Sequence, residues 1–201
     1  MNQQLDLFGA PKPEPPKYKY GVFLALFPDK FTADHISNQA AGIRKRRGLQ
    51  GRLRLTHHLH ISLHSLGGYS VVPYKILPFI AEICEAATAN IPPFKIELDR
   101  VLSFRGGVAG RPLVLINHCD GNAALMKLHQ AIGLELSKHL RHGRNVRFNP
   151  HLTLLYDQQG IPEESIDPIS WKVNEVVLVC SEINATKYER LGCWELGGCS
   201  N

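Results

Sequence analysis

The chain has 201 residues, of which 23 are Lys or Arg and 18 are Asp or Glu, so its formal net charge is +5. Hydrophobic residues make up 44% of the chain and charged residues 20%, which supports a buried core and excludes a wholly disordered, collagenous or coiled-coil protein. The longest apolar stretch covers residues 21–27 and is far shorter than the roughly 20 residues of a membrane-spanning helix, so no membrane contact is expected. The five cysteines form no C-x-x-C pair, which favours a reducing, cytoplasmic environment.

The first 17 residues differ in composition from the rest of the chain. Pro11, Pro13, Pro15 and Pro16 favour an extended, poorly packed tail. We therefore expect one folded, monomeric domain over residues 18–201. In chain order, hydrophobic periodicity predicts a strand at 20–27, a helix at 32–46, a strand at 57–66, a helix at 74–88, strands at 94–104 and 112–118, a helix at 122–139, and strands at 148–156, 171–181 and 188–196.

Two of the predicted strands carry the same four-residue pattern. His60-Ile61-Ser62-Leu63 and His151-Leu152-Thr153-Leu154 both read His, apolar, Ser or Thr, apolar, and they start 91 residues apart. Composition alone predicts roughly 0.15 occurrences of this pattern. Alternate residues of a strand share a face, so each imidazole should lie beside a hydroxyl while the apolar residues enter the core.

A histidine pair of this kind suits phosphodiester chemistry without a metal or cofactor. Imidazoles titrate near neutrality, so one can take a proton from water while the other protonates a leaving ribose oxygen, and the hydroxyls can bind phosphate oxygens. We assign His151 as the base and His60 as the acid.

Two alternatives compete with this interpretation. Both histidines can be half-buried strand residues with satisfied hydrogen bonds. Alternation also places His58, His60 and His64 on one face, where they would form a zinc or nickel cluster, although three ligands on one straight strand spread too far for a tight tetrahedron. We expect no metal site, and interpret His64 as a residue that lines the cleft.

Basic residues precede both histidine strands. Arg52 and Arg54 come before the first, and Arg144 and Arg147 before the second, so all four are candidate contacts to RNA phosphates. The alternative is a solvated surface without a binding role. Tyr156 is a candidate for stacking on a base, although aromatic residues in strands more often belong to the core.

The tail contains Gln4-Leu5-Asp6-Leu7-Phe8, which looks like the peptide with which bacterial DNA-processing proteins bind the replication sliding clamp. A short apolar peptide on a proline-stiffened leash can enter a groove of a partner. The alternative is that this segment packs on its own domain.

Four segments between Tyr18 and Leu196 carry a family resemblance: FLALFP, LHISLHSLG, NPHLTLLY and SEINATKYERLGCWEL. They resemble the 2H phosphoesterase superfamily, and within it the bacterial 2′-5′ RNA ligase and RNA 2′,3′-cyclic phosphodiesterase branch. Its His-x-Thr-Leu strands match the two histidine strands here. This chain departs from the family in having Ser62 for the commoner Thr, and Leu155 and Tyr156 where many relatives carry a small residue and then Arg.

The resemblance implies an α+β fold with two pseudo-symmetric lobes of antiparallel sheet, helices on the outside and a central cleft. It implies catalytic roles for His60 and His151 and phosphate binding by Ser62 and Thr153. The implied activity is hydrolysis of RNA or nucleotide 2′,3′-cyclic phosphates to 2′-phosphates, or cleavage and joining of 2′-5′ RNA linkages. The alternative function is a non-catalytic module that binds RNA ends or the sliding clamp.

Overall fold

The computed structural model describes residues 18–107, 109–118, 122–139, 148–183, 185 and 187–197. Its strands form one eight-stranded antiparallel sheet in the order β6-β3-β4-β5-β2-β1-β7-β8. The strands are β1 (Tyr20–Leu26), β2 (Ile61–Tyr69), β3 (Phe94–Ser103), β4 (Arg111–Ile116), β5 (Leu152–Asp157), β6 (Glu164–Val173), β7 (Glu175–Glu182) and β8 (Lys187–Glu195). The α-helices are α1 (Lys30–Arg47), α2 (Leu77–Thr88) and α3 (Ala123–His139).

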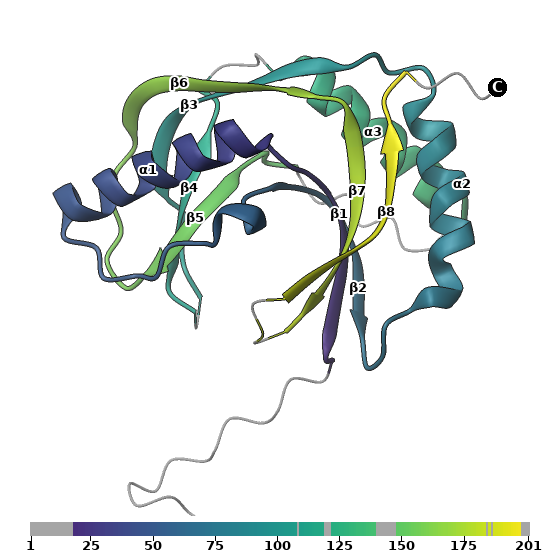
Figure 1. Cartoon of the computed structure of the whole chain (residues 1–201), viewed down its shortest axis with the longest axis horizontal. Helices are drawn as coiled ribbons and strands as arrows, with labels where there is room; N and C mark the ends of the chain where they lie inside the picture. The colour runs from purple at the N-terminus through teal and green to yellow at the C-terminus, as the bar shows by residue number, and fades with distance from the viewer. Residues whose placement is uncertain are drawn as a thin grey trace, which may run out of the picture.

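The sheet consists of two four-stranded halves that meet at one narrow seam. One half is β6-β3-β4-β5 and the other is β2-β1-β7-β8, and the two are joined by the antiparallel pairing of β2 with β5. The registered pair at this seam is Ile61 with Leu152, the first residues of their strands. Strands β2 and β5 both begin at this pair and run away from it in opposite directions, so the two halves of the sheet separate beyond it (Figure 1). This confirms the predicted α+β, two-lobed sheet.

The helices are divided between the two halves. Helix α1 begins after Asp29, whose carboxylate accepts the N–H of Thr32, and ends at Gly48, which has a positive φ of 65°. It contacts β6, while α2 and α3 pack on each other and contact β8 and β2 (Figure 1). The apolar face of α1, Ile36, Ala40 and Ile43, follows helical spacing and is buried.

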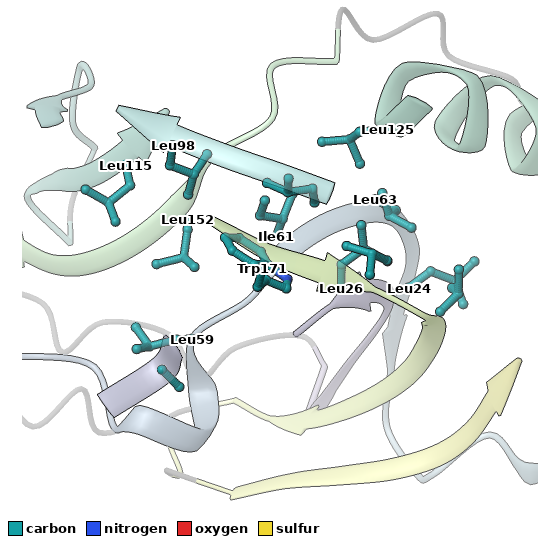
Figure 2. Packing of buried hydrophobic residues seen from close by; sticks show 14 of the residues in the cluster. Leu24, Leu26, Leu59, Ile61, Leu63, Leu98, Leu115, Leu125, Leu152 and Trp171 are labelled. Carbon is teal, nitrogen blue, oxygen red and sulfur yellow. The ribbon is translucent and has the colours of Figure 1, made fainter. Parts of the chain in front are cut away.

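One hydrophobic cluster runs through both halves of the sheet. Leu24 and Ile61 from one half, and Leu98, Leu152 and Trp171 from the other, are at most 3% exposed and lie close together (Figure 2). Complete burial of a side chain of this size contributes about 1.5–3 kcal/mol. The cluster therefore fixes the seam at Ile61 and Leu152 from one face of the sheet.

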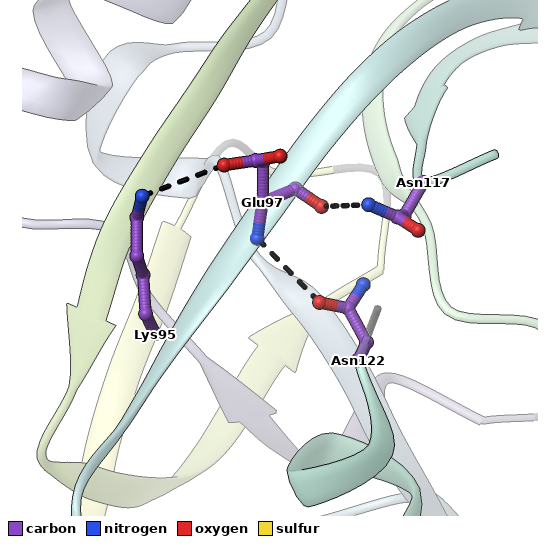
Figure 3. A network of polar contacts seen from close by, with 4 residues as sticks. All are labelled: Lys95, Glu97, Asn117 and Asn122. Atoms are coloured by element: carbon purple, nitrogen blue, oxygen red, sulfur yellow. Dashed lines mark hydrogen bonds and ion pairs between the residues drawn. The ribbon is translucent and has the colours of Figure 1, made fainter. Parts of the chain in front are cut away.

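Side-chain amides continue the sheet where β4 ends. Beyond Ile116, the Asn117 amide donates to the carbonyl of Glu97 at 3.0 Å, and the Glu97 N–H donates to Oδ1 of Asn122 at 3.5 Å (Figure 3). Lys95 pairs with the Glu97 carboxylate at the surface. These amides replace the ladder partners that β3 has lost and tie the start of α3 to the sheet.

Most predicted elements are present, with four differences. The predicted strand 148–156 starts only at Leu152. The predicted strand 57–66 starts only at Ile61, because Thr56–His58 forms a 3₁₀ turn. The predicted strand 171–181 is wrong, because these residues span the end of β6 and most of β7. Helix α2 starts at Leu77 because Pro78 occupies its first turn, where a missing N–H costs nothing. Within the described part of the chain, no helix is long and apolar enough to cross a membrane.

Candidate active site

The two histidine motifs meet at the seam of the sheet. Ile61 pairs with Leu152, and in an antiparallel ladder the residues on either side pair in opposite order. Ser62 therefore lies across from His151, and His60 lies across from Thr153. Directly opposed residues have Cβ atoms about 4.5–5.5 Å apart, and diagonal ones about 7–8 Å apart, so the four side chains lie within the reach of one phosphate group.

All four polar side chains are on the face opposite the main core. Ile61 and Leu152, between them in sequence, are fully buried in the main core. Ser62 is exposed, while His60, His151 and Thr153 are half-buried. The repeated motif thus places two imidazoles and two hydroxyls together on one accessible face, as alternation predicts.

His64 does not share this face, so its predicted position in the cleft is wrong. Ser62 pairs with Ala25 of β1, but His64 pairs with the next residue back, Leu24, so Leu63 is an extra residue in the ladder. This bulge shifts the alternation by one and turns His64 to the helical side. There its Nε2–H donates to the carbonyl of His129 at 2.9 Å, and the two rings stack at 4.1 Å.

The other half of the sheet has the same bulge at the equivalent place. Thr153 pairs with Val114 and Leu155 with Leu113, so Leu154 is the extra residue on β5. Leu155 is therefore the counterpart of His64 and is fully buried. The shift returns Tyr156 to the face that carries His151, where it remains 39% exposed.

His60 is held in one tautomer by its own turn. Its Nδ1–H donates to the carbonyl of His58 at 2.7 Å, since a carbonyl can only accept. Burial is the main cause that lowers the pKa of His60 to about 4, and the positive charge of Arg54 contributes to the same shift. The neutral ring therefore has an unprotonated Nε2, which accepts the Ser62 hydroxyl at 3.1 Å.

His151 repeats the arrangement in the other half. Its Nδ1–H donates to the carbonyl of Asn149 at 2.8 Å, so this imidazole too directs Nε2 away from its own turn. Each ring also contacts a phenylalanine: Phe23 stacks on His60 with centroids 5.0 Å apart, and Phe104 meets His151 edge to face at 5.1 Å. The two rings are therefore oriented before any substrate arrives.

An apolar wall borders His60, and sequence reasoning missed it. Phe27 and Tyr188 lie 5.7 Å from the His60 ring, measured between centroids, and pack with Phe23 around the small buried cluster of Ala25, Val177 and Val179. Phe23, Ala25 and Phe27 alternate along the first strand and its end. Leu24 and Leu26, on the other face of the same strand, are buried in the main core. Apolar residues on both faces of this strand were the sequence signal for a second apolar surface beside His60.

The arginines predicted to bind RNA fall into two groups. Arg52 and Arg54 line a pocket of about 280 Å³ together with Tyr156, and the Arg54 guanidinium lies 5.3 Å from the centre of the Tyr156 ring. Arg144 and Arg147 are outside the described residues, as is the peptide Gln4–Phe8.

The alternative metal cluster of His58, His60 and His64 does not form. His58 belongs to the 3₁₀ turn and stacks on Tyr188 at 3.9 Å, and His64 lies on the opposite face of the sheet. Among the described residues, no three His, Cys, Asp or Glu side chains are grouped so that they could hold a metal ion.

Comparison with known structures identifies the same fold in several proteins. TT0787 of Thermus thermophilus matches with a TM-score of 0.71 and 21% identity over 89% of this chain and 98% of that one. E. coli LigT complexed with 3′-AMP matches with a TM-score of 0.67 and 20% identity over 89% and 98%. A protein described as a phosphoesterase matches with a TM-score of 0.65 and 20% identity over 89% and 99%.

Comparison with curated proteins finds no match. The model of the 2′-5′ RNA ligase superfamily matches residues 32–183, a span that includes both histidine motifs. This match supports an enzyme with phosphoesterase activity in the broad sense. The chain belongs to the 2′-5′ RNA ligase superfamily, a group of 2H phosphoesterases.

Proposed function

We propose that the protein hydrolyses 2′,3′-cyclic phosphate ends of RNA to 2′-phosphates without a metal ion, and that cleavage or joining of 2′-5′ linkages is a related activity of the same site. One observation carries the proposal: the pairing of Ile61 with Leu152 puts both histidine motifs on one accessible face. A cyclic phosphate bound there would have an imidazole on either side.

The reaction needs one proton acceptor and one proton donor. A water oxygen attacks phosphorus while a base takes its proton, the bond from phosphorus to O3′ breaks, and an acid protonates O3′. The product is a 2′-phosphomonoester with a free 3′-hydroxyl. If the 5′-hydroxyl of a second RNA replaces water, the same proton transfers join the strands through a 2′-5′ linkage.

We assign the base to His60 and the acid to His151, the reverse of the expectation from sequence. His60 is neutral at neutral pH because burial lowers its pKa to about 4, and its Nε2 lone pair already accepts the Ser62 hydroxyl. His151 is the other imidazole beside the same phosphate, so it is left to supply the proton to O3′.

The hydroxyls and arginines hold the anion. When substrate binds, the Ser62 hydroxyl turns from Nε2 of His60 to a non-bridging phosphate oxygen, which leaves the Nε2 lone pair free for the attacking water. Thr153 donates to a second such oxygen, and hydrogen bonds to a charged acceptor contribute about 1.5–3 kcal/mol. Arg52 and Arg54 bind neighbouring phosphates of the RNA, and we keep Arg144 and Arg147 as further candidates on sequence grounds.

Product analysis tests the proposal. RNA with a 2′,3′-cyclic phosphate end is incubated with the protein in EDTA, and the product is separated as 2′- or 3′-phosphate. We expect turnover to a 2′-phosphate. Binding without turnover would instead identify a non-catalytic RNA-end module, and a 3′-phosphate would mean that the 2′-oxygen leaves.

The N-terminal peptide supports a second proposal, about a partner. Gln4-Leu5-Asp6-Leu7-Phe8 matches the sliding-clamp peptide in sequence, so we expect the full chain to bind a bacterial clamp through Leu7 and Phe8. Deletion of residues 1–10 should abolish binding in a gel-filtration assay. Equal binding by the intact and the deleted chain would contradict the assignment.

A further inference from the structure

The last turn of α1 carries a cluster of basic side chains. Its four members are consecutive and exposed: Arg44, Lys45, Arg46 and Arg47. Arg47 pairs with Glu164 of β6 at 2.6 Å, whereas the other three pair with no carboxylate in the described part of the chain. The sequence offers no acidic residue nearby, since no Asp or Glu occurs between Asp34 and Glu82. Three cations of this turn are therefore available to an anion from outside the chain.

The ending of the helix does not account for three unpaired cations. The carbonyls of Arg44 and Lys45 accept the N–H groups of Leu49 and Gly48, so the backbone itself closes the last turn. A cation near a helix C-terminus contributes only about 0.3–1 kcal/mol through the helix dipole, and several cations on one turn repel one another. A cluster of this kind instead raises the positive potential at the surface, which attracts a polyanion.

From this turn the chain returns toward the histidine pair. After Gly48 it runs back along α1, and the 3₁₀ turn just before His60 contacts that helix (Figure 1). The returning segment carries Arg52, which is exposed, and Arg54, which is half-buried. The N–H of Arg54 donates to the carbonyl of Leu154 at 2.7 Å, which holds the segment on β5. Cations therefore follow one course from the end of α1 to the candidate active site.

The length of α1 sets the distance between the two ends of this course. The Phe27 ring lies 5.7 Å from the His60 ring, and α1 begins three residues later, at Lys30. The 18 residues of α1 rise about 27 Å in total, so its last turn lies about 25 Å from the histidine pair. Stacked nucleotides rise about 3.4 Å each, so about seven of them span this distance. One nucleotide cannot contact both ends.

We infer that the last turn of α1 binds the backbone of an RNA strand several nucleotides to the 5′ side of its cyclic phosphate end. The inference rests on the proposed function and adds a substrate class, which is RNA of about seven nucleotides or more. Arg52 and Arg54 contact the phosphates nearest the end, and the three unpaired cations of α1 contact phosphates further back. Contacts to phosphate carry no sequence information, so this surface selects for length and not for sequence.

The experiment compares a long RNA with a single nucleotide. The probes are a ten-nucleotide RNA that ends in a 2′,3′-cyclic phosphate and adenosine 2′,3′-cyclic phosphate. The variant combines Arg44→Gln, Lys45→Gln and Arg46→Gln, because Gln is a good helix former without charge. At about 0.1 M salt, the ratio of kcat/KM for the long RNA to kcat/KM for the nucleotide should fall about 10- to 100-fold.

Salt dependence provides a second measurement. For the long RNA, the slope of log kcat/KM against log salt concentration should become shallower by about 2, since each lost contact to a single strand removes about 0.7. The matched control combines Lys75→Gln, Lys172→Gln and Lys187→Gln, which remove the same charge at exposed positions outside α1. It should keep the wild-type slope, and its ratio should stay within about twofold of wild type.

An unchanged ratio and slope in the α1 variant, or equal changes in the control, would overturn the inference. Lys45→Gln alone is the second variant if the triple variant does not fold, and it should reduce the slope by about 0.7. Failure of the proposed function is recognised separately, because wild type would then turn over neither probe.

In that case the affinity for a ten-nucleotide RNA that ends in a 2′-phosphate decides, measured by fluorescence anisotropy. The α1 variant should bind this RNA about 10- to 100-fold more weakly than wild type and the control. Equal affinities of the three proteins would overturn the inference.

Discussion

The carboxylate of Asp157 accepts the backbone N–H of Gly51 at 2.6 Å, although the two residues are 106 positions apart. The same carboxylate accepts the N–H groups of Gln50 at 2.6 Å and Gln159 at 2.9 Å, which hold the pKa of Asp157 below its usual range. Asp157 thereby fastens the segment that carries Arg52 and Arg54 to the end of β5. Gly51 fits only without a side chain, since a Cβ would lie 2.1 Å from the carbonyl oxygen of Tyr156.

We predict that Asp157→Ala destabilises the protein by about 2–4 kcal/mol, because it leaves several backbone donors without a charged acceptor. It should also raise KM for oligonucleotide substrates, since Arg52 and Arg54 are no longer held against β5. Urea unfolding and steady-state kinetics measure the two effects. Asp167→Ala, which removes an exposed carboxylate on β6, is the control. Wild-type stability and KM in Asp157→Ala would contradict the role.

The hydroxyl of Thr153 gives a second prediction. Thr153→Val keeps the shape of the side chain but removes the donor to phosphate, so kcat/KM should fall by about 10- to 150-fold. Thr153→Ser keeps the hydroxyl and should retain most activity. If both variants lose activity equally, Thr153 acts through packing and not through its hydroxyl.

The roles of the histidines predict the acidic limb of the pH profile. If His60 is the base, kcat/KM should fall on acidification with an apparent pKa of about 4, because the free enzyme must have an unprotonated Nε2. The measurement is kcat/KM for a cyclic nucleotide from pH 4 to 8, with circular dichroism to show that the protein stays folded. An acidic limb at pH 6.5 or above would assign the base to another group.

Three stacked aromatic rings on the helical face of the sheet, those of His64, His129 and Phe148, predict how the free energy of unfolding depends on pH. His129 lies between His64 and Phe148, with centroid distances of 4.1 and 3.9 Å, and burial lowers the pKa of His129 to about 4. Between pH 6.5 and about 4 the unfolded chain therefore binds more protons than the folded chain at this position. Stability should be complete above pH 6.5 and should decrease as the pH falls through this window.

His129→Phe tests this account because it keeps an aromatic ring in the stack and removes its titration. The loss of unfolding free energy between pH 7 and pH 4.5, measured with urea, should be smaller in this variant than in wild type. His35→Gln, at an exposed position on α1, is the control and should retain the wild-type loss. An identical loss in His129→Phe and wild type would contradict the prediction.

Alternate residues of a strand lie on the same face, and this rule correctly predicted which residues within each motif lie together. It placed His60 with Ser62 and His151 with Thr153, since period 2 holds over three residues of each strand. The rule gave the wrong face for His64, because the β-bulge at Leu63 shifts the alternation by one residue. No Gly or Pro marks this bulge in the sequence, since it arises from the pairing of β2 with β1. The seam between Ile61 and Leu152, and the bond between Asp157 and Gly51, join residues far apart in sequence, so no local pattern encodes them.

The central claim is that His60 and His151 act on one phosphate as a pair. Its most direct test is the kcat of His60→Ala, of His151→Ala and of the double variant on a 2′,3′-cyclic phosphate in EDTA. Each single variant should lose about 10²- to 10⁴-fold, and the double variant should lose little more than the worse single one, since either loss disables the shared reaction. Undiminished turnover in either single variant, or losses that multiply in the double variant, would contradict the claim.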